Sequence, residues 1–327
     1  PRIRRRRASS GQPSAHRRHA SGAAAMIFLL RRILHGLLLL FGVSVLSFAF
    51  FELAPGDFLE DLKVNPQVGS ETVQQLRNRH LLDRPAAERY IYWAAAAAHG
   101  DLGYSLAYSM PVSSLVWDRA GATLRLSAAA LLICWGLAVP LGFWCAAWPG
   151  GWVNRLAGAV ASVLVSLPDL LLALLFLWTV IYTGAGPVSG KLIPAAVALS
   201  CVSFPTVFRH ARASAAEALR MPFVDHLRAC GIAERRIVFR HAPRAALNPL
   251  ISLFGLSLGS MMGSSLVVEV VLGWPGMGPL LLESILARDA PVVLASVLLS
   301  SLFLVCGNLA ADWLLYAADP RIREWGQ

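Results

Sequence analysis

Charged side chains are scarce in this sequence. Only 15% of the 327 residues are Asp, Glu, Lys or Arg, whereas 56% are hydrophobic. An average soluble domain carries about 25% charged residues, so this composition excludes an ordinary soluble protein. Long apolar runs separated by polar intervals instead indicate an all-α, polytopic membrane protein.

Cysteine is also scarce, and its positions argue against oxidative or metal chemistry. The five cysteines fall in apolar runs or in intervals expected on the cytoplasmic side, and disulfides are rare in the cytosol. Their spacing matches no metal-ligand pattern. We therefore expect no disulfide, no metal site and no cofactor bound by this chain. The positions are Cys134, Cys145, Cys201, Cys230 and Cys306.

The sequence lacks a nucleotide-binding or hydrolase motif in a suitable context. Residues 186–192 read GPVSGKL, but a P-loop needs Gly and then Ser or Thr where this chain has Ala185 and Leu192. Residues 255–259 match G-x-S-x-G, but Ser257 lies in a continuous apolar run rather than at a strand-to-helix elbow. An enzyme within the membrane would need a nucleophile–base or metal constellation, and the sequence offers none.

Six apolar segments predict six membrane spans of about 20 residues or more. Arginines flank the first span at 31–32, fill the interval 209–246 and follow the last span at Arg321 and Arg323. Positive charge in short loops favours the cytoplasmic side, so both termini are expected there. The spans cover about 33–53, 123–147, a segment after the turn at 148–152 that ends at about 182, 192–208, 247–272 and 292–317.

The first 25 residues contain seven of the arginines, and without them the net charge falls from +10 to +3. The segment has no apolar periodicity, so we predict a disordered basic tail. No aromatic residue is interleaved for base stacking. Anionic membrane lipid is therefore a better partner than nucleic acid. Met26 looks like a natural translation start, which leaves open whether residues 1–25 are native; we take 26–327 as the transmembrane domain.

The interval 54–121 predicts a small helical insertion on the extracytoplasmic side. Residues 71–80 fit a short surface helix, and Arg84-Pro85 leads into another helix that ends at about His99. Long loops cross the membrane largely regardless of their charge, so its arginines do not oppose this placement.

The basic interval 209–246 has the pattern of a helix, a short helix and a further helix, separated by breaks. Pro222 fits the first turn of a helix, and Asp225 follows where a carboxylate meets the positive end of the helix dipole. Gly231 fits the left-handed position that ends a helix. One face of the short helix then carries the apolar side chains of Phe223, Val224 and Leu227.

The same interval contains a series of residues that resembles a known family. In order they are Glu217, Asp225, Arg228, Gly231, Glu234-Arg235-Arg236 and Arg240-His241-Ala242. The series is similar to the cytoplasmic loop of permease subunits in ABC-type importers, above all the dipeptide, oligopeptide and nickel branch.

Further motifs extend the resemblance over nearly all of 26–323. They are Pro55-Gly56-Asp57, Leu82-Asp83-Arg84-Pro85, the run Gly100 to Ser105, Glu269 to Gly278 and Asp319 to Arg323. The chain departs from the family pattern at Phe58, Leu272 and Pro243. Proline at 243 removes a backbone donor, so we expect a kink in the helix that leaves the loop.

The resemblance implies a type I ABC importer permease fold in a bacterial inner membrane. It also implies a second homologous permease chain, two ATPase subunits that use ATP and Mg²⁺, and an extracytoplasmic substrate-binding protein. The short helix would be a coupling helix that docks on an ATPase. The expected coupling residues are Glu217, Phe223, Val224, Asp225, Leu227, Arg228, Gly231, Glu234, Arg235, Arg236, Arg240 and His241.

Two carboxylates and three glycines inside the spans have structural and functional interpretations. Asp169 and Glu269 either line the substrate path or are hydrogen-bonded within the helix bundle. Gly255, Gly259 and Gly263 recur every four residues, which predicts close packing of another helix.

Two alternatives remain at the level of function. The basic loop would only fix topology if no ATPase docked on it. A secondary transporter or channel subunit would work without an ATPase, but it typically shows charge pairs or repeated broken helices, of which the sequence gives little sign. The substrate is open among dipeptides, oligopeptides, nickel and other small solutes.

Overall fold

The computed structural model describes residues 15–53, 84–184 and 190–318, and its described part is almost entirely helical. Five of its helices are long and apolar enough to cross a membrane, and a bent pair makes a sixth span if counted as one. The single helices are α1 (Ala15–Leu53), α5 (Val112–Ala147), α8 (Leu192–Leu219), α12 (Leu247–Leu272) and α14 (Ala290–Ala318); the bent pair is α6 (Trp152–Ser166) and α7 (Asp169–Tyr182).

The third span ends at Tyr182, as predicted, but it consists of two helices. α6 and α7 meet at an angle of 111°. Leu167 between them has extended backbone angles, φ −95° and ψ 132°. Pro168 explains the break, because proline disfavours the helical conformation at the preceding residue and lacks an N–H for the helix ladder.

The second span's helix begins about three turns before its predicted start at 123. α5 starts at Val112, and Val112, Leu115 and Val116 are buried on one face. This spacing of three and four residues is that of an amphipathic helix, although the intervening polar residues give the segment the composition of a loop. The last ten residues of the predicted insertion, 112–121, are therefore part of α5.

The first helix begins at Ala15, within the tail for which the sequence predicts disorder. Residues 15–25 are helical in the structure, while 1–14 lie outside the described residues. Extending an existing helix avoids a new nucleation cost, and this stretch is rich in alanine, the best helix former. Farther along, Arg32 of α1 forms an ion pair of 3.2 Å with Asp312 of α14.

The fifth and sixth spans lie as predicted. α12 has the predicted bounds, and α14 starts and ends within two residues of them. Gly142 of α5 packs against α8 so closely that an added methyl group would lie 2.9 Å from the backbone nitrogen of Arg212. This approach joins the two helices in the half of the bundle that carries α9 (Pro222–Ala229).

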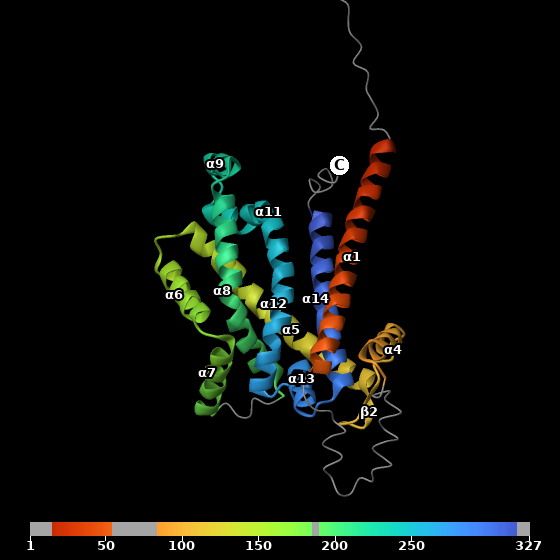
Figure 1. The fold of residues 1–327 in the computed structure, drawn as a ribbon. Helices are drawn as coiled ribbons and strands as arrows, with labels where there is room; N and C mark the ends of the chain where they lie inside the picture. Colours follow the sequence, from red (N-terminus) through yellow and green to blue (C-terminus); the bar gives the residue numbers. More distant parts are fainter. Residues whose placement is uncertain (1–14, 54–83, 185–189, 319–327) are drawn as a thin grey trace, which may run out of the picture.

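The ends of the molecule carry different structures (Figure 1). One end holds α9, the start of α1 and the end of α14; the other holds α4 (Ala86–Ala98), a hairpin and α13 (Met277–Leu286). α4 matches the helix predicted after Arg84-Pro85, whereas the helix predicted at 71–80 lies outside the described residues. The hairpin pairs β1 (Tyr104–Ser105) with β2 (Met110–Pro111).

Neither the hairpin nor α13 is predicted by the sequence analysis, yet the hairpin brings the Gly100–Ser105 motif to Asp289. The Ser105 hydroxyl donates a hydrogen bond of 2.6 Å to the buried Asp289 carboxylate, and the amide of Ala107 donates to the same oxygen at 3.1 Å. Tyr108 donates to Glu283 at 2.5 Å. The hairpin is thereby fastened to the segment that joins α13 to α14.

Candidate coupling site

The short helix α9 stands beyond the end of α8 and begins at the proline that the sequence assigns to its first turn. α8 continues past its predicted end at 208 to Leu219, as the first helix of the loop. Met221 is extended, with φ −71° and ψ 143°, and Pro222 then starts α9. The missing N–H of Pro222 costs nothing at this position. The break at 220–221 therefore turns α9 away from the axis of α8 (Figure 1).

Gly231 ends α9 in the predicted left-handed conformation, with φ +75°. Its amide donates to the Arg228 carbonyl at 2.9 Å, and the amide of Ile232 donates to the Leu227 carbonyl at 3.2 Å. These two bonds form a Schellman motif, which satisfies carbonyl groups at the end of a helix. A residue with a Cβ would be strained here because of its positive φ.

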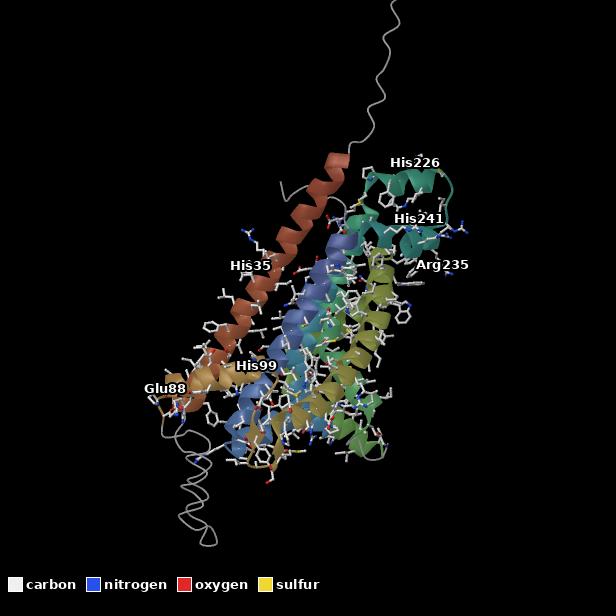
Figure 2. All side chains as sticks on the ribbon, turned by 90° about the vertical axis from the view of Figure 1, so that its right-hand side faces the viewer. His35, Glu88, His99, His226, Arg235 and His241 are labelled. Carbon is white, nitrogen blue, oxygen red and sulfur yellow. The ribbon has the colours of Figure 1, made fainter. Side chains whose placement is uncertain are left out.

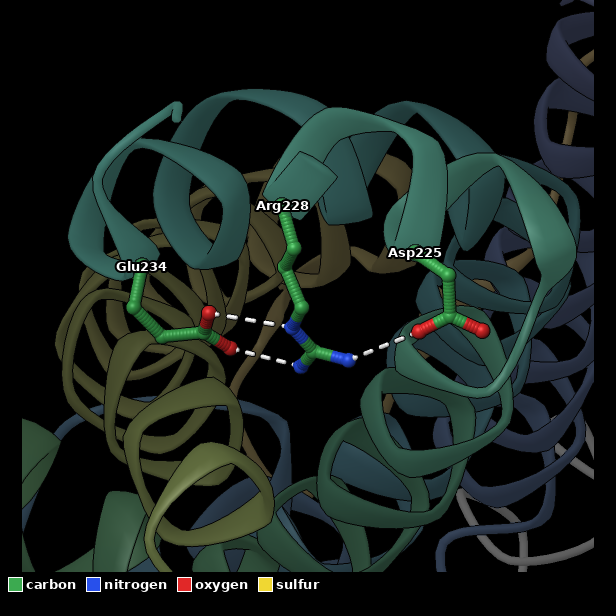
Figure 3. Close-up of polar contacts among 3 residues, drawn as sticks. All are labelled: Asp225, Arg228 and Glu234. Atoms are coloured by element: carbon green, nitrogen blue, oxygen red, sulfur yellow. Dashed lines mark hydrogen bonds and ion pairs between the residues drawn. The ribbon is translucent and has the colours of Figure 1, made fainter. Parts of the chain in front are cut away.

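Arg228 joins α9 to the next helical turn, α10 (Glu234–Arg236) (Figure 3). Its guanidinium donates two hydrogen bonds to the Glu234 carboxylate, at 2.7 and 3.2 Å, and one to Asp225 at 3.2 Å. Hydrogen bonding to Glu234 raises the pKa of Arg228, and the bond from Arg228 lowers the pKa of Glu234. We call these three residues the Arg228 clamp. The clamp brings together three predicted coupling residues, but it pairs their charges with one another.

The apolar residues of α9 divide into a buried and an exposed group. Val224 is fully buried and Leu227 is partly buried against the same core, which includes Ala215, so they hold α9 on the bundle. Val224 is therefore not available in this structure as the docking contact expected from the sequence. Phe223 remains 37% exposed, and Met221, which the sequence analysis did not single out, is 36% exposed.

The chain leaves the site through an irregular helical segment. α10 is followed by a π-helical turn, η1 (Ile237–His241), and a four-residue helix, α11 (Ala242–Ala245), before α12 begins. The sequence predicts a kink at Pro243, and the π-helical turn directly precedes it. Such turns accommodate a lost helix hydrogen bond and are frequent at functional sites. Ile237 and Val238 are fully buried and anchor the segment.

The remaining predicted coupling residues lie around α9 without forming a single cluster. Glu217, Arg235, Arg236 and Arg240 are exposed, and His241 is partly buried. Figure 2 shows His226, Arg235 and His241 at the same end of the molecule, with His35 midway along α1 and with Glu88 and His99 on α4 toward the opposite end. The site is thus a basic, mostly solvated surface. It carries Phe223 on α9, and the Arg228 clamp joins α9 to α10.

Two of the three glycines predicted to pack against another helix do so. An added methyl group at Gly255 would overlap the Ala311 side chain, and one at Gly259 would lie 2.7 Å from Leu304. Both partners belong to α14, so α12 and α14 approach closely there. Gly263 has no atom within 4 Å of its added Cβ, so the structure shows no close approach of another helix there.

Glu269 is buried in a structural role at the far end of α12. Its carboxylate accepts a hydrogen bond of 2.7 Å from the amide of Gly278, and Gly276 lies so close that it has no room for a side chain. The Trp274 indole donates to the Ala122 carbonyl of α5 at 3.1 Å. The carboxylate therefore fastens the turn between α12 and α13 within this chain, in line with the second of the two interpretations.

Asp169 is partly buried and lies at the first residue of α7, just after the break at Pro168. It accepts a hydrogen bond of 2.8 Å from the Ser264 hydroxyl of α12. Ser264 was not among the predicted site residues, because a single serine in an apolar run has no pattern to mark it. The contact joins the broken span to α12.

Comparison with known proteins identifies the family. The model of the binding-protein-dependent transport system inner membrane component matches residues 138–324. The chain belongs to this family. The match covers α8 to α14 and therefore includes the whole coupling site. It shows a multi-pass inner-membrane component of a transport system.

Curated relatives match over almost their entire length. The oligopeptide transport system permease protein AppB of Bacillus subtilis is 29% identical over 312 residues, covering 90% of this chain and 98% of AppB. The glutathione transport system permease protein GsiC of Escherichia coli O6:H1 is 32% identical over 305 residues, with the same coverage.

A solved structure of the MetNI methionine ABC transporter supports the fold assignment. It has a TM-score of 0.56 at 19% identity and covers 63% of this chain and 96% of its own. The fold of this family member is therefore the type I permease fold of ABC importers, as the resemblance of its motifs implies.

Proposed function

We propose that this chain is the membrane-spanning permease subunit of an ABC importer and forms half of a translocation pathway. The observation that carries the proposal is the coupling site, an exposed helix on a rigid support, within a chain that belongs to the transport family. ATP and Mg²⁺ would be used by a separate ATPase, because the chain has no P-loop.

The proposed mechanism transmits motion through α9. Closure of an ATPase dimer would carry α9 with it, and Phe223 and Met221 would supply the apolar contact. The Arg228 clamp and buried Val224 would make α9 move together with α8 and η1. Exposed Arg236 and Arg240 would supply charge complementarity to the ATPase.

The assembly we propose contains a second homologous permease chain, two ATPase subunits and an extracytoplasmic binding protein. Both termini would lie in the cytoplasm, on the same side as α9. The arginines of the loop support this orientation. So does the arrangement in Figure 1, where the start of α1, the end of α14 and α9 share one end.

Peptides are the proposed substrate class. Support comes from the relatives, which are named as oligopeptide and glutathione permeases and align over 90% of this chain. Glutathione is itself a short peptide, so the two names agree on a peptide backbone as the shared chemistry.

The docking contact is tested by association of the chain with its ATPase. Phe223→Asp places a charge in the proposed apolar contact, and we expect at least about a tenfold loss of affinity, the size of an aromatic hot spot. Tyr104→Asp, an equally exposed aromatic residue at the opposite end, is the control and should bind as the wild type does. Unchanged affinity of a correctly inserted Phe223→Asp protein would make the loop a topology determinant only.

A further inference from the structure

A second surface feature lies beside α9 and includes Arg235, one of the expected coupling residues. It is a hollow of about 420 Å³ between the turn that joins α5 to α6 and the helix α10. This volume falls within the usual range of small-molecule sites, about 300–1,000 Å³. Its walls are Trp144, Trp148, Gly151, Trp152, Val153 and Arg235.

The walls of the hollow are mainly aromatic. The rings of Trp144 and Trp148 lie 4.6 Å apart between centroids, and Trp144 also lies 6.3 Å from Phe239 of η1. Trp152, on the first turn of α6, is 73% exposed. Tryptophan is enriched where a membrane surface meets water, because its ring is apolar and its N–H is polar.

The charge of the hollow is positive. Arg235 is its only charged wall residue, and it is exposed and forms no ion pair within the described part of the chain. Its neighbour Glu234 is occupied by Arg228 in the clamp. A guanidinium beside an aromatic wall, without a carboxylate in the lining, is suited to a phosphate that carries an apolar group.

The position of the hollow fits the depth of lipid headgroups. It lies at the end of α5 that faces α10, at the level where the apolar helices give way to the basic loop. On the orientation argued above, this level is the cytoplasmic surface of the membrane, where anionic lipids attract arginine.

We propose that the hollow binds an anionic phospholipid of the cytoplasmic leaflet. Arg235 donates hydrogen bonds to the lipid phosphate, and Trp144 and Trp148 contact the glycerol and the upper part of an acyl chain. The occupant is a lipid rather than free phosphate because three of the six wall residues are tryptophans, which offer apolar contact to an acyl chain. Arg235 follows Glu234 directly, so the lipid is joined to the Arg228 clamp. This site depends on membrane placement and not on docking of an ATPase.

The test is retention of phospholipid by the purified full-length chain, measured by native mass spectrometry after exchange into phosphatidylglycerol or phosphatidylcholine. Both lipids carry a phosphate, but the choline group neutralises it in phosphatidylcholine. The net negative charge of phosphatidylglycerol is therefore expected to give it about a tenfold preference at Arg235. Arg235→Gln should abolish the preference, and Arg235→Lys should restore part of it. Arg220→Gln is the control, because it removes an equally exposed arginine that does not line the hollow.

The possible outcomes either overturn the lipid proposal or separate it from the proposed function. Equal retention of both lipids, or the same loss in Arg220→Gln as in Arg235→Gln, would mean that the hollow does not select anionic lipid. Displacement by inorganic phosphate alone would identify a free-phosphate site. Release of lipid when the ATPase binds, together with protection of Trp152 from collisional quenching, would make the hollow part of the ATPase interface. Lipid retained at Arg235 without any ATPase docking at Phe223 would uphold this inference while contradicting the proposed function.

Discussion

Arg228 determines how rigidly α9 is held, because a single guanidinium binds carboxylates from two helical turns. The hydrogen bonds to Glu234 lie at 2.7 and 3.2 Å, and the bond to Asp225 lies at 3.2 Å. The Arg228 and Glu234 side chains are about 40% exposed, so water screens the pair and its contribution to stability is below about 1 kcal/mol. Its importance lies in fixing the angle between α9 and α10 more than in stabilising the fold.

The pH dependence of the Arg228 clamp follows from the lowered pKa of Glu234. A carboxyl whose pKa is lower in the folded state stabilises the fold above the unfolded value, about 4.3, and loses this contribution as the pH falls. The wild type should therefore be slightly more stable than Glu234→Gln at pH 7, and the difference should vanish as the pH falls below about 4. Thermal unfolding of both proteins at several pH values measures this. A difference that grows on acidification would contradict the clamp.

The residues of α9 show which parts of a site the sequence can predict. Pro222 and Gly231 were predicted correctly because their backbone requirements are local. The pairing of Arg228 with Glu234 could not be predicted, since it depends on how the chain turns after Gly231. The burial of Val224 next to exposed Phe223 depends on which face of a short helix meets the bundle, and one turn of sequence does not determine that.

At the scale of elements, the contact of α5 with α8 holds the helix that leads to the coupling site. Gly142 allows this contact, because its added Cβ would lie 2.9 Å from the Arg212 nitrogen and 3.0 Å from the Ala211 side chain. The backbone of α8 cannot yield as a flexible side chain can. α8, the helix that leads to α9, is thus packed directly against α5.

Replacing Gly142 by alanine tests this packing. The added methyl group should destabilise the protein by about 1–3 kcal/mol, the usual cost of overpacking. Gly136, in the same helix, has nothing within 4 Å of its added Cβ. Gly136→Ala should therefore be neutral or stabilising by up to about 1 kcal/mol, because alanine is the better helix former. Thermal unfolding in detergent compares the two; equal losses of stability would contradict close packing at Gly142.

Three features of the fold were not predicted because composition and local sequence pattern do not show them. The size of the bend at Pro168 could not be predicted, because composition alone does not show whether a proline bends a span by 111°. α13 is only ten residues long, too short to span and too apolar to suggest a surface helix. The β1–β2 hairpin is held by Asp289, which is 184 residues from Ser105, so no local pattern predicts it.

At the scale of the molecule, the two ends of the helix bundle carry different structural features. One end carries α9, the Arg228 clamp and the aromatic hollow. The opposite end carries turns that are fastened within the chain by Glu269 and Asp289. The overall class was predictable from composition and motif order, since both extend along the whole sequence. The proposed function as half of a pathway would also require a second permease chain.

The central claim is that peptide import is driven by a separate ATPase through α9. The most direct measurement is uptake of a labelled dipeptide into proteoliposomes that contain this chain, its partner permease and ATPase subunits, with ATP on the cytoplasmic side and the binding protein on the other. We predict uptake that requires ATP and that Phe223→Asp abolishes without loss of assembled permease. Uptake driven by a proton gradient, with the ATPase absent, would contradict the account and identify a secondary transporter.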